Sequence, residues 1–465
     1  MSISYDLIVL GSGPGGYVAA IRAAQLGLTV AIVEREALGG ICLNWGCIPA
    51  KALLRSAEIL HYMRNADAFG LAASGVSADL DAVVSRSRRV ADQLSRGVAF
   101  LMKKHKVAVH MGTGRLLGAG RMAVTAGDGV ETELVARDII VATGARAREL
   151  PFARFDGQRI WSYREAMTPP EKPSRLLIIG SGAIGVEFAS FYADLGVEVV
   201  IVEMADRIVP VEDTDISAHL AKVFEKRGIS VHTKSSVETL ITDANSVRAT
   251  LRDGDGSTTE EVFSHAILAA GVLPNIEGIG LETLGVAMER DHIVTDGQCR
   301  TSVDGVWAIG DVTAPPWLAH KAMHEAVIAA EAIAGERPLP IVVENIPACT
   351  FCRPQVASVG LTETAARAAG HDVRVGRFPL IGNGKAIALG EPEGFVKTIF
   401  DGATGQLLGA HMIGAEVTEL ISGYSIGKTG ALVAEDLIDT VFPHPTISEA
   451  MHEAVLAAYD RTLHL

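Results

Sequence analysis

The sequence contains few cysteines, no long hydrophobic run and no excess of positive charge. With 5 cysteines in 465 residues, it lacks the composition of a disulfide-stabilised scaffold. Its apolar runs, such as residues 176–179, are short and end at glycine, which indicates buried strands rather than membrane spans. The formal net charge of -14 argues against nucleic acid as a partner, because phosphate recognition needs basic patches.

Length and glycine content indicate an α/β protein with several domains. A chain of 465 residues is too long for one hydrophobic core, and we expect about three domains. The 48 glycines suit tight turns between strands and helices. An apolar strand begins near residue 5, which leaves no room for a signal or transit peptide, so we expect a cytoplasmic protein. In that reducing compartment, cysteines close together invite a catalytic interpretation.

Two segments of the chain share one plan. Residues 5–34 read as strand, GSGPGG, helix and a second strand, and residues 175–203 read as strand, GSGAIG, helix and a second strand. One G-x-G-x-x-G motif is a weak signal in a glycine-rich chain. Here each copy follows an apolar strand, opens a helix and has an acidic residue at the end of the next strand. The repeat therefore predicts two Rossmann-like dinucleotide-binding domains.

The glycines of each motif have three roles in such a domain. The first permits a tight turn, the second lets the backbone approach a pyrophosphate, and the third lets the helix pack on the strand. They are Gly11, Gly13 and Gly16 in the first motif and Gly180, Gly182 and Gly185 in the second. Glu34 and Glu203 close the second strands and can accept hydrogen bonds from ribose hydroxyls. The carboxylate of Glu203 would repel the 2′-phosphate of NADP, so we expect NAD in the second site.

The rest of the chain has no further nucleotide motif. Residues 56–106 have helical periodicity and indicate a helical insertion in the first nucleotide domain. After Pro338, strand and helix patterns alternate to the end of the chain, which predicts a separate α+β domain.

Cys42 and Cys47 lie five positions apart, directly after the first nucleotide motif. They could be core residues or half of a zinc site, but zinc ligands are usually closer in sequence and no second Cys or His cluster lies nearby. A redox disulfide fits the pair better. A helix that begins near Cys47 would lower the pKa of its thiol and favour the reactive thiolate.

The string GGICLNWGCIPAK at residues 39–51 resembles GGTCLNxGCIPSK of the flavin-dependent disulfide reductases, the class I pyridine nucleotide-disulfide oxidoreductase family. The resemblance covers the full chain and is greatest to members that oxidise dihydrolipoyl groups. It implies two Rossmann-like domains plus a C-terminal α+β dimerisation domain. The implied boundaries are 1–147 for an FAD-binding domain with a helical insertion, 148–273 for an NAD-binding domain, 274–343 for a central domain completing the FAD site, and 344–465 for dimerisation.

The resemblance also implies roles for single residues. Cys42 would be the thiol that meets the substrate and Cys47 the thiol against the flavin, with Lys51 near flavin N5 and paired with Glu187. Ala50 replaces a small hydroxyl residue of the family pattern. Besides the first glycine motif, Glu34 and Lys51, the implied FAD contacts are Thr143, Gly144, Asp311, Leu318, Ala319 and His320. The implied NAD contacts are the second glycine motif, Glu203 and Gly271; Val272 stands where arginine is common.

A base is implied by FPHPTISE at residues 442–449, which resembles the family's HPTxSE. Alone, a histidine between prolines is more often a turn residue. With the cysteine motif present, His444 is expected to move protons at the thiols and Glu449 to orient it. In the family this histidine serves the disulfide of the partner subunit, which implies a homodimer.

Other histidines and cysteines are expected to be structural. His324 and His452 belong to this group. Cys349 and Cys352 stand in a strand-like run, where an offset of three places the side chains on opposite faces, so we expect both in the core.

The expected reaction is FAD-dependent oxidation of protein-bound dihydrolipoyl groups by NAD, with no metal. The expected partner is the lipoyl-bearing acyltransferase of a 2-oxo acid dehydrogenase complex, or the lipoyl carrier of glycine cleavage. A glutathione reductase is the nearest alternative, but it prefers NADPH and would want basic residues where this chain has Glu203 and Asp206. Mercuric reductase needs a C-terminal cysteine pair, which this chain lacks. A soluble transhydrogenase needs neither a disulfide nor a histidine base, and both are expected here. A docking role in a dehydrogenase complex is compatible with the enzyme activity.

Overall fold

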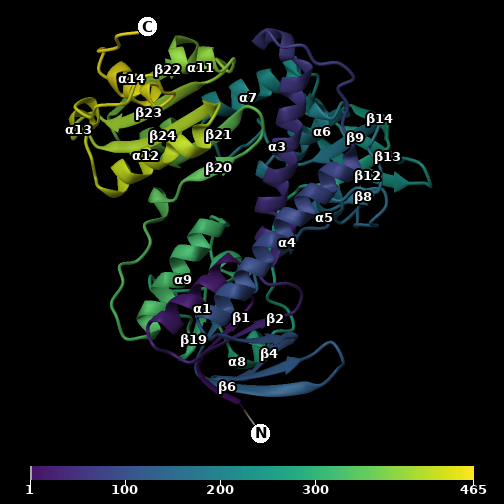
Figure 1. The fold of residues 1–465 in the computed structure, drawn as a ribbon, viewed down its shortest axis with the longest axis vertical. Coiled ribbons are helices and arrows are strands. Elements are labelled where there is room, and N and C mark those ends of the chain that lie inside the picture. Colours follow the sequence, from purple (N-terminus) through teal and green to yellow (C-terminus); the bar gives the residue numbers. More distant parts are fainter. Residues whose placement is uncertain (1–2, 465) are drawn as a thin grey trace. The chain divides into compact units, whose positions relative to one another are not determined.

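The computed structural model describes residues 3–464 and divides the chain into two compact units (Figure 1). The first unit comprises Met1–Ala52, Val84–Arg148 and Val272–Ile341, and the second comprises Leu53–Val83, Glu149–Gly271 and Val342–Leu465. Two of the boundaries between the units, after Ala52 and after Val83, fall inside helices α3 (Cys47–Arg64) and α4 (Leu80–Lys104), the two long helices of the expected insertion. The division into four domains expected from the sequence stays a prediction.

The first unit contains a seven-stranded sheet in the order β3-β2-β1-β6-β5-β4, with β19 also paired to β6. The strands are β1 (Ile3–Leu10), β2 (Val30–Glu34), β3 (Ala108–Met111), β4 (Thr113–Gly118), β5 (Arg121–Thr125), β6 (Glu131–Val141) and β19 (Val306–Ala308). Strands β3, β2, β1, β6 and β19 are parallel, whereas β4 and β5 are antiparallel. The carboxyl ends of the parallel strands therefore meet at one edge of the sheet.

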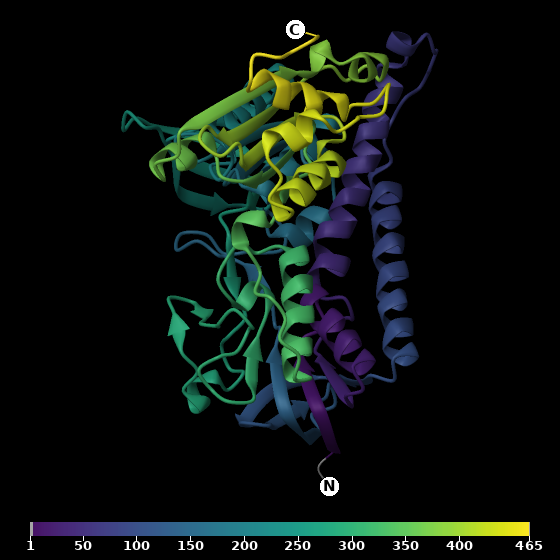
Figure 2. The same ribbon diagram turned by 90° about the vertical axis from the view of Figure 1, so that its left-hand side faces the viewer.

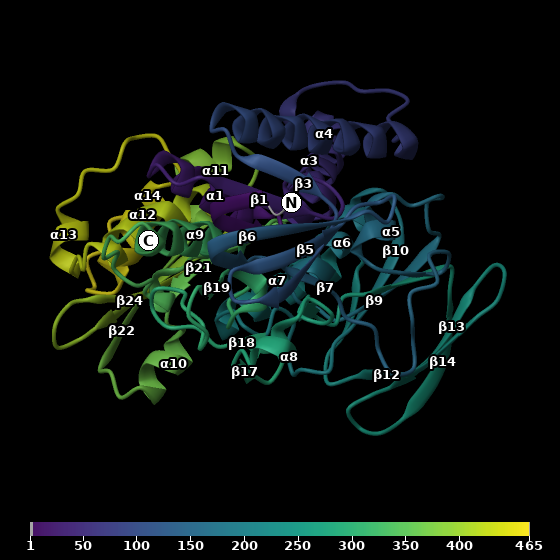
Figure 3. The same cartoon turned by 90° about the horizontal axis from the view of Figure 1, so that it is seen from below.

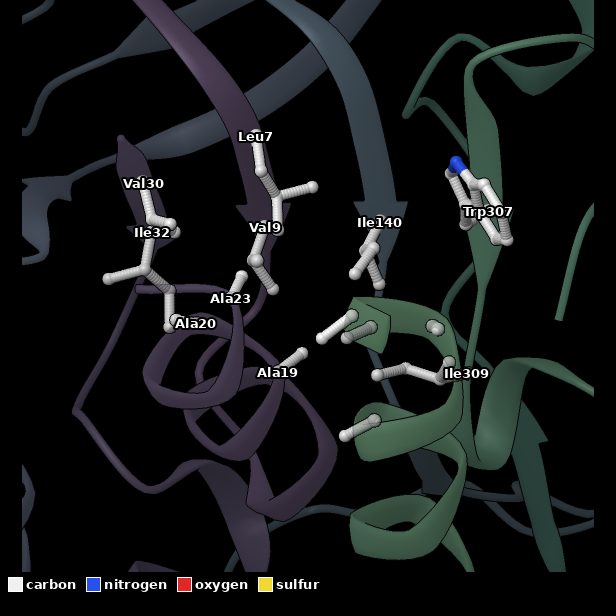
Figure 4. Close-up of a cluster of buried hydrophobic side chains, with 14 of the residues drawn as sticks. Leu7, Val9, Ala19, Ala20, Ala23, Val30, Ile32, Ile140, Trp307 and Ile309 are labelled. Carbon is white, nitrogen blue, oxygen red and sulfur yellow. The ribbon is translucent and has the colours of Figure 1, made fainter. Parts of the chain in front are cut away.

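Helices α1 (Pro14–Gln25) and α9 (Ala319–Ile333) pack against one another in this unit (Figures 1 and 2). The core lies between them and the strands, where Val9 and Ile32 are paired neighbours with fully buried side chains. Figure 4 shows the small side chains of Ala19 and Ala23 directed toward these strands. Because alanine is small, α1 can lie close to the sheet on this face. This packing fixes the position of α1 and therefore of its first turn.

The second unit repeats the nucleotide-binding plan. Its parallel sheet has the order β11-β10-β9-β15-β8. The strands are β8 (Ile160–Trp161), β9 (Arg175–Ile179), β10 (Glu198–Val202), β11 (Ser230–His232) and β15 (His265–Leu268), with helices α5 (Tyr163–Met167), α6 (Ala183–Asp194) and α7 (Thr214–Lys226). Strands β9 and β10 have the residues that the sequence predicts for them. Strands β12 (Ser236–Thr242), β13 (Val247–Arg252) and β14 (Thr258–Phe263) form a separate antiparallel sheet, at the lower right of Figure 3.

The C-terminal part of the second unit is an antiparallel sheet with helices, as the sequence predicts. Its order is β20-β21-β24-β23-β22. The strands are β20 (Ala348–Thr350), β21 (Gln355–Gly360), β22 (Val373–Pro379), β23 (Phe395–Asp401) and β24 (Leu407–Gly414), and the helices are α10 (Glu363–Ala368), α11 (Gly384–Ala388), α12 (Val417–Thr429), α13 (Ala434–Ile438) and α14 (Glu449–Ala457). Among residues 3–464, no helix has both the length and the apolar character needed to cross a membrane.

A buried charged cluster connects the start of α7 to strand β23 within the second unit. The side chain of Lys397 is 1% exposed, and its Nζ donates to Asp213 Oδ1, Asp215 Oδ2 and Glu363 Oε2, each at 2.9 Å. Asp213 also caps α7 by accepting from the backbone N–H of Asp215. A buried cation with several carboxylates is stable only as a complete set, because an unpaired buried charge is costly.

Glu212 lies beside this cluster and is buried without an ion-pair partner among the described residues. Its Oε2 accepts no hydrogen bond within residues 3–464. Burial raises its pKa from 4.5 to about 7, assisted by Asp213 and partly offset by Ser358. Glu212 is therefore expected to be neutral below neutral pH.

We expect the Glu212→Gln variant to be more stable than the wild type above pH 7. Because folding raises the pKa, the wild type has its full contribution below about pH 4.5 and loses it as the pH rises through about 7. At roughly 1.4 kcal/mol per pKa unit, the difference at pH 8 should be on the order of 2–3 kcal/mol. Urea unfolding at pH 5 and pH 8 measures it, with the exposed Glu260→Gln as control. Equal effects at both pH values would contradict the assignment.

Candidate functional site

Cys42 and Cys47 form a disulfide in the first unit. Cys42 lies in helix α2 (Gly40–Trp45), Cys47 is the first residue of α3, and their Cα atoms are 4.7 Å apart. The helix expected to begin near Cys47 is confirmed, whereas α2 was not expected from the sequence. The N-terminal dipole of the 18-residue helix α3 favours a thiolate at its first residue.

The disulfide segment begins against the first glycine motif. The backbone N–H of Gly39 donates to the carbonyl of Ser12 at 3.0 Å. Gly40 has φ +58°, and a Cβ there would lie 2.7 Å from Gly13 Cα. The two glycines after β2 therefore let the chain turn directly beside the phosphate-binding loop.

The glycines of the two motifs divide into those the fold requires and those that leave open space. A Cβ at Gly16 would overlap the carbonyl oxygen of Gly11, and one at Gly185 would overlap that of Gly180. A Cβ at Gly13 or Gly182 would contact no protein atom within 4 Å. Open backbone at the start of a helix is the cradle that a pyrophosphate needs, so these loops fit dinucleotides.

The acidic residue at the end of the second strand is held by a serine in each motif. Ser12 donates to Glu34 Oε2 from its N–H at 3.0 Å and from its Oγ at 2.6 Å. Ser181 donates to Glu203 Oε2 in the same way, at 2.8 and 2.7 Å. Sequence reasoning missed both serines, although the shared second position of the two GSG strings was the available signal.

The turn after β6 is the second segment of the first unit that the sequence predicts to contact FAD. Thr143 Oγ1 donates to the carbonyl of Asn275 at 2.6 Å, and Asn275 Nδ2 donates back to the carbonyl of Thr143 at 3.0 Å. The N–H of Asn275 donates to the carbonyl of Gly144, which has φ +67°. The predicted FAD turn is thus fixed by the segment that contains Val272.

Asp311 is placed by a buried ion pair that sequence reasoning missed. Lys321 Nζ contacts Glu325 Oε1 at 2.7 Å, and Glu325 Oε2 accepts from the N–H of Gly310 at 2.7 Å. Burial raises the pKa of Asp311 to about 6, with Lys321 lowering it and Glu325 raising it. Hydroxyl donors such as those of a ribityl chain would offset this cost, so the site fits FAD.

Helix α9 begins beside Asp311, as expected. Its N-cap is Leu318, whose side chain makes no capping hydrogen bond, followed by Ala319 and the exposed His320. The first N–H groups of the helix and the helix dipole suit an acceptor that carries negative charge.

The remaining predicted cofactor residues are distributed between the two units. Lys51 is half-buried in α3 of the first unit. Glu187 is buried in α6 of the second unit, where its Oε1 accepts from the N–H of Phe351 at 2.9 Å. Gly271 in the second unit has φ +97°. The pairing of Lys51 with Glu187 stays a prediction.

His444 and Glu449 form the predicted pair. His444 Nδ1 lies 2.9 Å from Glu449 Oε1, and the N–H of Thr446 donates to Glu449 Oε2 at 2.9 Å. Partial burial acts to raise the pKa of Glu449, but the bonds from Thr446 and His444 outweigh it and lower that pKa. An ionised carboxylate only accepts, so Nδ1 carries the proton and Nε2 is the basic nitrogen.

The other cysteines and histidines named above contact backbone carbonyl groups or solvent. Cys352 is buried beyond the end of β20, and its Sγ contacts the carbonyl of Pro354 at 3.2 Å. Cys349 lies in β20 with its Sγ 3.8 Å from the carbonyl of Thr418. His452 contacts the carbonyl of Ile438 at 2.9 Å, and His324 is exposed.

The chain belongs to the pyridine nucleotide-disulphide oxidoreductase family. Residues 5–326 match the family model of that description, and residues 346–455 match the model of its dimerisation domain. Family membership assigns FAD and NAD(H) as cofactors. The resemblance inferred from the sequence and the α/β architecture with a dimerisation domain are confirmed.

Several relatives cover the whole chain. It is 58% identical to dihydrolipoyl dehydrogenase of Zymomonas mobilis and 43% identical to that of Bacillus subtilis, over 100% of both chains in each case. Among solved structures, it is similar to LpdA of Mycobacterium tuberculosis with a TM-score of 0.90 and 30% identity, over 97% of this chain and 99% of that one. The flavoprotein disulfide reductase RclA of Escherichia coli has a TM-score of 0.88 and 26% identity, over 98% and 99%.

Alanine at the two kinds of glycine should have different effects. Gly182→Ala should fold, since its φ of -65° suits alanine and nothing lies within 4 Å, but the methyl group should obstruct the pyrophosphate. We expect an NADH dissociation constant at least ~10-fold higher, about 1.4 kcal/mol. Gly185→Ala should instead lower the unfolding temperature. Fluorescence titration and thermal unfolding measure these effects, and unchanged NADH binding by Gly182→Ala would contradict the assigned cradle.

Proposed function

We propose that this chain oxidises protein-bound dihydrolipoyl groups to lipoyl groups and reduces NAD⁺ to NADH, the dihydrolipoyl dehydrogenase reaction. The observation that carries the proposal is the Cys42–Cys47 disulfide. The segment that contains it starts in contact with the predicted dinucleotide-binding loop at Gly13. The full-length identity of 43–58% to dihydrolipoyl dehydrogenases supports the choice of substrate.

The residues predicted for FAD all lie in the first unit, and those predicted for NAD all lie in the second. Gly13, Glu34, Thr143 and Asp311 would hold FAD through its phosphates, ribose and ribityl chain. When bound, FAD supplies the two-electron connection between the thiol pair and NAD⁺.

The thiol chemistry follows from the two cysteines and the base. Nε2 of His444 of the partner subunit takes a proton from one substrate thiol, and that sulfur attacks Cys42 Sγ. The Cys42–Cys47 bond breaks, a mixed disulfide forms, and Cys47 leaves as a thiolate at the N-terminus of α3. The second substrate thiol attacks the first substrate sulfur and gives its proton to the departing Cys42 sulfur. The lipoyl disulfide forms, Cys42 is released, and the protein has gained the two electrons that the substrate lost.

The chain is proposed to act as a homodimer, which its match to the dimerisation domain supports. The lipoyl group would come from the acyltransferase of a 2-oxo acid dehydrogenase complex or from the lipoyl carrier of glycine cleavage. The cytoplasmic location expected from the sequence stays a prediction. Use of NAD rather than NADP is supported by the fixed carboxylate of Glu203, which argues against a glutathione reductase.

Initial rates with two substrate pairs test the proposal. The purified flavoprotein should reduce NAD⁺ rapidly with dihydrolipoamide and should not oxidise NADPH with glutathione disulfide. Cys47→Ser should keep FAD but lose dihydrolipoamide turnover by at least about 10³-fold, because no disulfide remains to accept electrons. Cys349→Ser is the control and should keep its turnover. Glutathione activity, or normal turnover by Cys47→Ser, would overturn the proposal.

The Glu449→Gln variant should lower kcat about 10–100-fold, because the amide orients His444 less well and does not stabilise its charged form. The exposed Glu419→Gln is the matched control and should keep the wild-type kcat. A wild-type kcat in Glu449→Gln would contradict the role of Glu449.

A further inference from the structure

Helix α4 contacts the disulfide segment, residues 38–52, at three backbone carbonyl groups. Arg88 Nη1 donates to the carbonyl of Asn44 at 2.6 Å, near the end of α2 and between the two cysteines in sequence. Ser95 Oγ donates to the carbonyl of Leu38 at 2.9 Å, before the segment's first helix. Arg86 Nη1 donates to the carbonyl of Ala52 at 2.8 Å, after Cys47. These residues all belong to the first unit.

Arg88 makes the central contact of the three. Its guanidinium lies over the ring of Trp45, with Cζ 4.6 Å from the ring centroid. Its Nε and Nη2 are buried and have no hydrogen-bond partner among the described residues. Besides the charge of Asp92 on the same helix, the contacts of this cation are with the Trp45 ring and the Asn44 carbonyl, both at the end of α2.

Asn44 continues the connection into the segment. Its Nδ2 donates to the carbonyls of Leu38 and Gly40, at 3.0 and 2.9 Å. The carbonyl of Leu38 also accepts from Ser95, so α4 and Asn44 meet at the same atom. Leu43 packs with Val98 and Met102 of α4 in the core of the first unit. Helix α2 is thus attached to α4 by polar and apolar contacts that do not involve the disulfide.

These contacts matter most when the disulfide is open. In the oxidised protein the S–S bond itself joins α2 to the start of α3. After reduction that bond is gone, and Gly46 is the only residue between the two helices. Glycine restricts the backbone little, so other contacts must keep the two sulfur atoms close. The disulfide can re-form rapidly only if the effective concentration of one thiol at the other stays high.

We propose that Arg88 is a positioning residue that keeps Cys42 and Cys47 within reach of each other while their disulfide is open. The inference rests on the proposed redox role of this pair, and it does not depend on which dithiol is the substrate. The stacked guanidinium and its bond to Asn44 fix the end of α2 relative to α4. Loss of that contact should favour the dithiol over the disulfide.

The test measures the disulfide–dithiol equilibrium of the FAD-loaded protein in dithiothreitol buffers, by alkylation and mass spectrometry of the Cys42 and Cys47 peptides. Arg88→Gln should reduce the equilibrium constant for disulfide formation about tenfold, which makes the midpoint potential ~30 mV more positive. Arg88→Lys should shift it in the same direction, because lysine lacks the planar group that stacks on Trp45. Arg89→Gln, on the exposed next residue of α4, is the matched control and should not shift it.

The sign of the shift separates positioning from simple electrostatics. If Arg88 acted only as a cation that stabilises thiolates, its removal would disfavour the dithiol and make the potential more negative. A negative shift, no shift, or full retention of the wild-type value by Arg88→Lys would each overturn the proposal. If Arg88→Gln does not fold, Trp45→Leu provides a second variant. We expect a positive shift of the midpoint potential in Trp45→Leu, and the absence of this shift would contradict the proposal.

These measurements use neither dihydrolipoamide nor NAD, so the two proposals fail separately. A wild-type protein inactive with dihydrolipoamide would refute the proposed function and leave the role of Arg88 to the equilibrium measurement. An unshifted disulfide–dithiol equilibrium in Arg88→Gln would refute only the proposed role of Arg88 and would leave the proposed function untouched.

Discussion

The close approach of a helix to the turn before it is the constraint on which both nucleotide sites depend. At Gly16 and Gly185 the helix lies so near the carbonyl of the motif's first glycine that no side chain fits. This contact sets the direction of α1 and α6. Their N-terminal N–H groups therefore face the open space beside Gly13 and Gly182. In the first unit the same geometry brings Gly40 against Gly13, which places the cysteine pair beside the loop. Phosphate binding and disulfide placement therefore share one packing requirement.

Much of this arrangement could be predicted because it is local in the sequence. Strands β9 and β10, the close packing at Gly16 and Gly185, the start of α3 at Cys47 and the start of α9 after Leu318 each depend on a few neighbouring residues. The pair of His444 and Glu449 spans five positions and was predictable for the same reason. Its role is implied by the resemblance of the motif and not by the pairing alone, because His371 and His464 also contact carboxylates.

The features that escaped prediction join residues far apart in the chain. Lys397 contacts Asp213 across 184 positions, and Arg88 contacts Asn44 across 44. Neither pair has a periodic signal, since a lone Lys or Arg in a sequence is ordinarily a solvated surface residue. Ser12 and Ser181 were missed for a different reason: serine is unremarkable in a turn, and only its hydrogen bonds to Glu34 and Glu203 give it a role. Helix α2 was missed because its six residues are too few for a periodic pattern.

The base and the disulfide differ in how completely one chain builds them. The cysteine pair is partly buried, and its segment contacts the first glycine loop and α4 of its own unit, whereas the side chain of His444 is 79% exposed and contacts Glu449. Because the Nδ1 proton is directed to that carboxylate, the basic nitrogen faces away from the residues that orient it. This exposure suits the proposed homodimer, in which each chain would supply the disulfide of one site and the proton carrier of the other.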